Sequence, residues 1–156
     1  MSAALAHTGR SGVSRFTFHV SRAAALLAAL WAGSLWTICG IVAPSLFALL
    51  DDRRLAGDLA GSFFRIEAWF GLFCGGLLAL LLSVARTGRR GTYVWIAITA
   101  LAPVLSEVGI RPLMSAARAA GDMARFGLLH TVSAVLFVLA SAGALILILR
   151  LTRPAE

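Results

Sequence analysis

The stretch AAALLAALWAGSLWTICGIVAPSLFALL, residues Ala23–Leu50, contains no charged side chain. An α-helix rises ~1.5 Å per residue, so about 20 apolar residues are enough to cross the hydrocarbon core of a bilayer. Three further stretches are predominantly apolar, with few ionisable side chains, at about residues 59–85, 92–113 and 126–149. In a chain of 156 residues that is 60% hydrophobic, this pattern predicts an all-α membrane protein with four transmembrane helices.

The segments outside these stretches are short. Residues 1–22 are rich in Ser, Gly and Arg, and we expect them to form a flexible cytoplasmic tail. Residues 151–156 should form a second, C-terminal cytoplasmic tail. The first apolar run is too long for the core of a cleaved signal peptide. The connections leave no room for another domain, so residues 23–150 are predicted to form one antiparallel four-helix bundle.

The basic charge of the chain is a topology signal. The net charge is +7, and all 14 basic residues are arginines. The short segment Arg86–Gly91 carries three of them and no acid, whereas Asp51, Asp52, Asp58 and Asp122 dilute the arginines of the other two connections. The positive-inside rule then places both termini in the cytoplasm (N-in/C-in). We therefore expect a multi-pass membrane protein with both ends in the cytoplasm and no nucleic-acid partner.

Four ionisable residues lie inside or at the rim of the apolar stretches. They are Glu67, Glu107, Arg111 and His130, and threading the chain through a bilayer puts them at similar depth on the outer side. Ionisable groups in hydrocarbon are costly and usually face a bundle interior or a water-filled cavity. The four residues are therefore the predicted ligand or ion site, which would open toward the outer leaflet.

The spacing around Glu67 predicts its direction. Gly71 and Gly75 follow it at intervals of four residues, on the same helix face. A GxxxG pair lets another helix backbone approach closely. Glu67 should thus point toward a neighbouring helix, where it would bind a proton or cation or be neutralised by Arg65, Arg111 or a backbone group.

The other three residues each allow two interpretations. Glu107 followed by Arg111 is the favourable order for an intrahelical ion pair, but Arg111 could also hold an anionic ligand. Because Pro112 follows Arg111, the span should end or bend there. His130 is either a hydrogen-bonded interface residue or a ligand, and together with Glu67 and Glu107 it could hold a divalent metal ion.

Four segments resemble one known family. They are LWAGSLWTICGIVAPSLF (Leu30–Phe47), AGDLAGSFFRIEAWFGL (Ala56–Leu72), EVGIRPLM (Glu107–Met114) and FGLLHTVSAVLF (Phe126–Phe137). The chain is similar to a small four-span family of unknown function from proteobacterial inner membranes. It also resembles a eukaryotic transmembrane protein linked to platinum-drug resistance, and more remotely copper-resistance membrane proteins with inward-facing His. The resemblance implies a four-helix membrane protein without an established chemistry.

Three classes of function remain open from the sequence. The first is handling of a small cation, a metal or another small solute at the outer-leaflet site, in a homo-oligomer within the lipid bilayer. The second is a non-catalytic accessory or assembly protein that binds another membrane protein. The third, an intramembrane oxidoreductase dependent on haem or metal, rests on His130 and on the remote likeness to copper-resistance proteins. The chain lacks a nucleotide-binding loop and the H-E-x-x-H, G-x-S-x-G and C-x-x-C motifs, so we expect no enzymatic activity.

Overall fold

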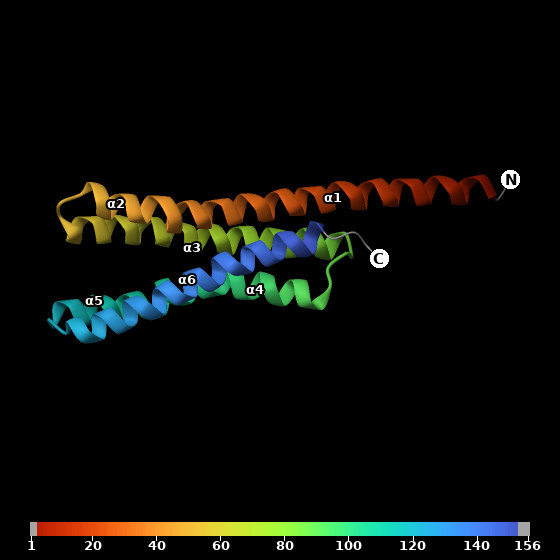
Figure 1. Ribbon diagram of the computed structural model, residues 1–156. Coiled ribbons are helices and arrows are strands. Elements are labelled where there is room, and N and C mark those ends of the chain that lie inside the picture. The colour runs from red at the N-terminus through yellow and green to blue at the C-terminus, as the bar shows by residue number, and fades with distance from the viewer. Residues whose placement is uncertain (1–2, 153–156) are drawn as a thin grey trace.

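The structure is a computed structural model that describes the backbone of residues 3–152 and the side chains of residue 15 and residues 17–152. Every regular element in this part of the chain is helical, which confirms the all-α prediction (Figure 1). In chain order the elements are α1 (Ala3–Thr37), the π-helical turn η1 (Ile38–Val42), α2 (Ala43–Leu49), α3 (Arg53–Val84), α4 (Arg90–Leu105), the π-helical turn η2 (Ser106–Ile110), α5 (Arg111–Ala119) and α6 (Met123–Thr152).

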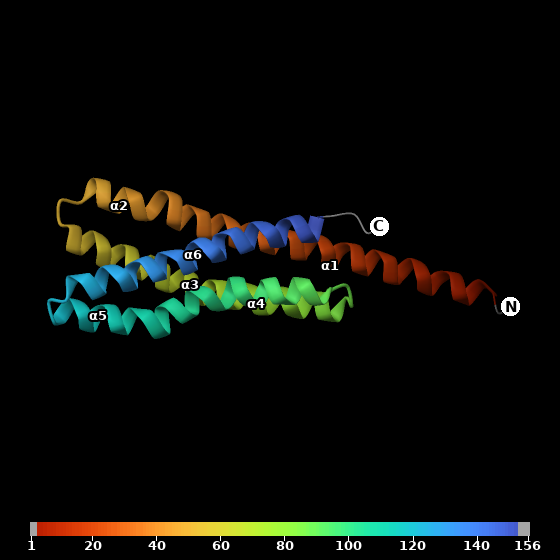
Figure 2. The same ribbon diagram turned by 60° about the horizontal axis from the view of Figure 1, so that its bottom comes forward.

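Four spans in the described part are long and apolar enough to cross a membrane: Thr17–Leu49, Arg53–Val84, Arg90–Ala119 and Met123–Thr152. The first combines the end of α1 with η1 and α2, and the third combines α4, η2 and α5. Around the bundle, α1 packs against α3, α3 against α4, α4 against α6, and α6 against α1. Successive spans run antiparallel (Figure 1, Figure 2). The predicted four-helix bundle is therefore confirmed.

Both compound spans contain a π-helical turn directly before a proline, at positions 44 and 112. The residue before each proline donates its N–H to the carbonyl five residues back, Ala43 to Ile38 and Arg111 to Ser106. Proline lacks an N–H and crowds the carbonyl four residues earlier, and a wider turn relieves that crowding. The helix therefore passes through both prolines. An end or a bend was predicted at Arg111; the span does not end there, because α5 begins directly after η2.

Acidic side chains begin two of the helices. Asp52 Oδ1 accepts hydrogen bonds from two backbone N–H groups in the first turn of α3, so that helix begins at Arg53, before its apolar part. Asp122 accepts in the same way from the N–H of Arg125, after Gly121 has ended the preceding helix with a φ of 72°. The second span is thus longer than its apolar run at residues 59–85.

Helix α1 begins at Ala3, so residues 3–22 of the segment expected to form the cytoplasmic tail are helical and continuous with the first span. The flexibility of this segment stays a prediction. Adding residues to an existing helix costs little free energy, and this segment contains no proline. Figure 1 shows this part of α1 extending beyond the rest of the bundle. Residues 153–156 of the expected C-terminal tail lie outside the described residues.

Small residues allow three spans to meet closely in the core. Trp31 of α1 is fully buried and lies over α3 at Gly71, where an added Cβ would stand 2.8 Å from Trp31 Nε1. An added Cβ on Gly75 would stand 2.9 Å from Ala100 Cβ of α4. The face that carries Glu67, Gly71 and Gly75 is buried, as their four-residue spacing predicts.

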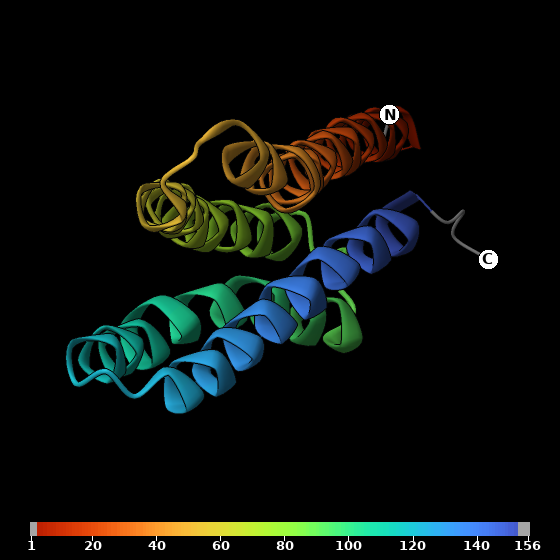
Figure 3. The same cartoon turned by 60° about the vertical axis from the view of Figure 1, so that its left-hand side comes forward.

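The bundle opens at the end where α2 and α5 lie. There α2 packs against α3, and α5 packs against α6. Figure 3 shows the ribbons of these two helix pairs diverging toward this end. We call this end of the molecule the α2/α5 end. The divergence of the two helix pairs at this end determines which ionisable side chains come into contact.

The close contact at Gly71 leads to a prediction. We expect Gly71→Ala to destabilise the bundle by about 1–3 kcal/mol, because the new methyl group would displace the buried Trp31 indole. Thermal unfolding of the detergent-solubilised protein measures this change. The matched control is Gly76→Ala, where nothing lies within 4 Å of the new Cβ and the better helix propensity of Ala adds up to about 1 kcal/mol. Equal midpoints for the two variants would contradict the packing described.

Candidate ion site

Glu67 is the most buried acidic side chain in the described part of the chain, with 3% of its surface exposed. The hydroxyl of Ser34, on α1, donates to Glu67 Oε1 across 3.0 Å. The three ion pairs found among the described residues do not include Glu67. A neutral hydroxyl therefore holds this carboxyl group, and it is not paired with Arg65 or Arg111.

The Ser34 hydroxyl has two acceptors within reach. Its Oγ lies 2.8 Å from the carbonyl oxygen of Trp31 and 3.0 Å from Glu67 Oε1. A hydroxyl group has a single hydrogen, so it cannot donate fully to both at once. If Glu67 carries a proton, the carboxylic acid can donate to Ser34 Oγ while Ser34 donates to Trp31. The same heavy-atom positions thus accommodate the protonated and the ionised carboxyl group.

A polar contact joins the first span to the fourth. Cys39 Sγ of η1 lies 4.0 Å from Ser141 Oγ of α6, and Ser141 donates to a carbonyl of its own helix.

An aromatic pair lies toward the α2/α5 end. The rings of Phe64 on α3 and Phe137 on α6 pack with their centroids 4.6 Å apart. These two helices lie diagonally across the bundle, so the pair fills its interior. Phe64 precedes Glu67 by three residues, or ~4.5 Å along the helix.

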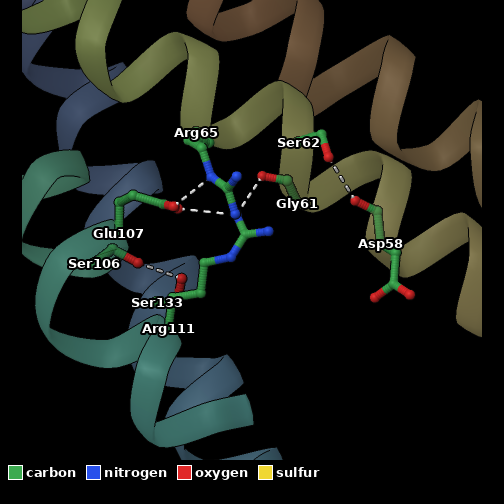
Figure 4. Close-up of polar contacts among 8 residues, drawn as sticks. All are labelled: Asp58, Gly61, Ser62, Arg65, Ser106, Glu107, Arg111 and Ser133. Carbon is green, nitrogen blue, oxygen red and sulfur yellow. Dashed lines mark hydrogen bonds and ion pairs between the residues drawn. The ribbon is translucent and has the colours of Figure 1, made fainter.

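Glu107 is the centre of a second polar cluster, between Arg65 and Arg111 (Figure 4). Arg65 Nε lies 2.7 Å from Glu107 Oε1, and Arg111 NH1 lies 3.0 Å from Glu107 Oε2. Arg111 NH1 also donates to the carbonyl oxygen of Gly61 across 2.6 Å. The cluster therefore joins α3 to η2 and α5 at the end where the helix pairs diverge. The predicted Glu107–Arg111 pair is present, and Arg65 is its additional partner.

Ser106 strengthens the same region from the other side. Its hydroxyl forms a hydrogen bond with that of Ser133 on α6 (Figure 4). Ser106 and Glu107 are neighbours in the π-helical turn η2, so their side chains reach different helices. The turn thus connects α6 with α3.

The Glu107 cluster leads to a prediction. We expect Glu107→Gln to destabilise the fold by about 2 kcal/mol, because two arginines lose the charge that they share. The measurement is thermal unfolding in detergent. Asp58→Asn is the control, since the Asp58–Arg118 pair is exposed, spans 3.4 Å and should contribute less than about 1 kcal/mol. A larger effect at Asp58 than at Glu107 would argue against the bridging role.

His130 does not join either cluster. It is exposed on α6, and its ring stacks on Phe126 with centroids 6.1 Å apart. Further along α6, Phe137 and Ser141 are buried. The divergence of the helix pairs at the α2/α5 end leaves His130 uncovered.

The predicted metal set is not assembled. Glu67, Glu107 and His130 lie in three different surroundings, and no group of three or more His, Cys, Asp or Glu side chains in the described part of the chain could hold a metal ion. The side chain that meets Glu67 is instead Ser34 of α1.

Sequence reasoning missed two of these contacts. Arg65 was expected as a partner of Glu67, but its side chain, 53% of which is exposed, places Nε against Glu107. Ser34 was not considered. Arg65 and Ser34 each lie at the same depth as an acidic residue on the adjacent antiparallel span, Glu107 and Glu67 respectively. This match in depth is the signal in the sequence that could have identified both residues.

Comparison with known proteins places the chain in a family without assigned chemistry. The family model described as "Domain of unknown function (DUF4149)" matches residues 26–123. This range includes Ser34, Glu67 and the Arg65–Glu107–Arg111 cluster. No curated protein and no solved structure matches the chain. The expected likeness to the platinum-resistance protein stays a prediction.

Proposed function

We propose that this chain, which belongs to the DUF4149 family of unknown function, binds and relays a small cation at Glu67, in the simplest case a proton. The observation that supports the proposal is the burial of Glu67 against a single neutral donor, Ser34. A carboxyl group that only specified helix packing would be expected to have a cationic partner, as Glu107 has. Intramembrane carboxyl groups without such a partner are typical of ion and proton pathways.

The contacts of Ser34 support a proton in particular. Protonation of Glu67 would let both acceptors of the hydroxyl be satisfied, and release of the proton would return the Ser34 hydrogen to the carboxylate. The exchange requires only the rotation of a hydroxyl group. A relay of this kind places no demand on the backbone.

The orientation proposed for the protein places both termini in the cytoplasm of a bacterial inner membrane. The arginines of the α3–α4 connection and Arg150 are exposed at one end of the bundle, and the aspartates lie toward the other end. With this orientation, Glu67 belongs to the outer half of the membrane. Because four spans leave little room for alternating access within one chain, we expect the active form to be a homo-oligomer.

A second candidate function is that of a non-catalytic accessory protein. The observation that favours it is the Glu107 cluster, in which Glu107 and Arg111 bind each other, Arg65 and the backbone of Gly61. These groups would then fix the register of the helices. An accessory protein should keep its phenotype when Glu67 is replaced, provided that the fold survives.

The proposal predicts that Glu67→Gln abolishes proton flux. Purified protein in liposomes is exposed to a K⁺ diffusion potential, and an internal pH dye records the flux. We expect a decrease of about tenfold or more, because an amide cannot bind and release a proton in this range. The amide N–H₂ group can donate to Ser34 as the carboxylic acid would, so the variant should fold, and thermal unfolding verifies this.

The control for this experiment is Asp58→Asn, an acid-to-amide change at an exposed site. It should conduct as the wild type does. If the wild type and Glu67→Gln both show only background proton flux, the proposal that Glu67 relays protons is contradicted. Normal flux from Glu67→Gln would show that another group carries the proton.

A further inference from the structure

A groove open to the membrane lies beside Glu67. It is bordered by the first span and by Phe63 of α3, and it has a volume of about 610 Å³. Ligand pockets of small molecules cover this size range. The lining residues are Ala29, Leu30, Gly33, Ser34, Thr37, Ile38, Val42 and Phe63.

The groove lies where the first span changes from an α-helix to the π-helical turn η1. Ile38 and Val42 belong to that turn, and the other residues of the first span precede it. Gly33 leaves the floor open, since nothing lies within 4 Å of the position its Cβ would take. Leu30 and Phe63 are exposed at its edges. A molecule dissolved in the bilayer can therefore reach the groove from the side.

The lining of the groove limits the chemistry of its occupant. Ser34 and Thr37 are its two polar residues, and none of its residues is charged. It therefore suits an apolar body with a single polar group. A phospholipid headgroup fits poorly, because the lining offers no basic side chain for the phosphate.

Ser34 connects the groove with the buried carboxyl group. Its hydroxyl lines the groove and also donates to Glu67 Oε1. While it donates to Glu67, its oxygen can accept a hydrogen bond from a group in the groove. The negative charge behind Ser34 makes a cationic donor the complementary group.

From these observations we propose that the groove binds a membrane-dissolved amine. Its ammonium group donates a hydrogen bond to Ser34 and is attracted by the negative charge of Glu67, which lies behind that hydroxyl. The inference rests on the proposed cation site at Glu67. It adds a lateral route from the bilayer and a substrate class, a hydrophobic organic cation. The apolar body of the amine would lie against Gly33 and Phe63.

The test is a binding measurement in phosphatidylcholine nanodiscs. Three probes share one dansyl-alkyl body and end in a primary amine, an alcohol or a sulfonate. We expect the wild type to bind the amine about tenfold more tightly than the alcohol, because a charged hydrogen bond is gained, and to bind the sulfonate least. Equal binding of amine and alcohol would overturn the proposal.

Two leucine variants test the location. Gly33→Leu should weaken amine binding about tenfold, since its side chain would occupy the groove. Gly127→Leu is the matched control, because it also adds a leucine at an exposed glycine with nothing within 4 Å. Both variants should unfold at similar temperatures. Equal amine binding by the two variants would place the amine elsewhere and overturn the proposal.

Two further arms separate this inference from the proposed function. Glu67→Gln should lose the preference for the amine, and an unchanged preference would contradict the inference. If Glu67→Gln abolishes proton flux while the wild type binds no amine, the relay stands and the groove proposal fails. Replacing phosphatidylcholine with phosphatidylethanolamine should leave binding unchanged, whereas competition would identify a phospholipid as the occupant and overturn the choice of a free amine.

Discussion

The hydrogen bond between Ser34 and Glu67 is the interaction on which the site depends. Hydrocarbon offers no water to a buried carboxyl group, so the protein itself has to supply its partners. Here the partner is a hydroxyl with one hydrogen and two acceptors. The carboxyl group thus remains responsive to a proton or a cation. An arginine in the same place would have fixed its charge.

The two acidic side chains of the spans illustrate this difference. Glu107 lies between two arginines and holds diverging helices together, while Glu67 is more completely buried and takes part in none of the ion pairs among the described residues. The Phe64–Phe137 pair fills the bundle interior on the side of Glu67 toward the α2/α5 end. The structure therefore separates a charge cluster that supports the fold from a carboxyl group that is available for chemistry. Depth in the membrane alone would group them together.

The sequence was sufficient for the number of helices, their antiparallel order and the face of Glu67. Apolar runs determine the spans, short connections determine their order, and Gly71 and Gly75 show which side of α3 is buried. The sequence was not sufficient to predict that His130 is exposed, because the burial of a side chain also depends on whether a neighbouring helix covers it. The divergence at the α2/α5 end comes from the packing of whole helices, and no local pattern around His130 records it. Arg65 was considered as a partner of Glu67, and its actual partner, Glu107, lies on another span.

The π-helical turns have a consequence for the way the third span presents its side chains. Such a turn holds one residue more than an α-helical turn, so everything beyond it is rotated relative to an uninterrupted helix. Deleting a single residue from η2 would restore an ordinary α-helical turn and swing α5 by about 100°. Arg111 would then face away from Gly61. The number of residues in η2 therefore determines the direction in which the side chains of α5 point. The loss of one codon can change that direction while the helix stays continuous.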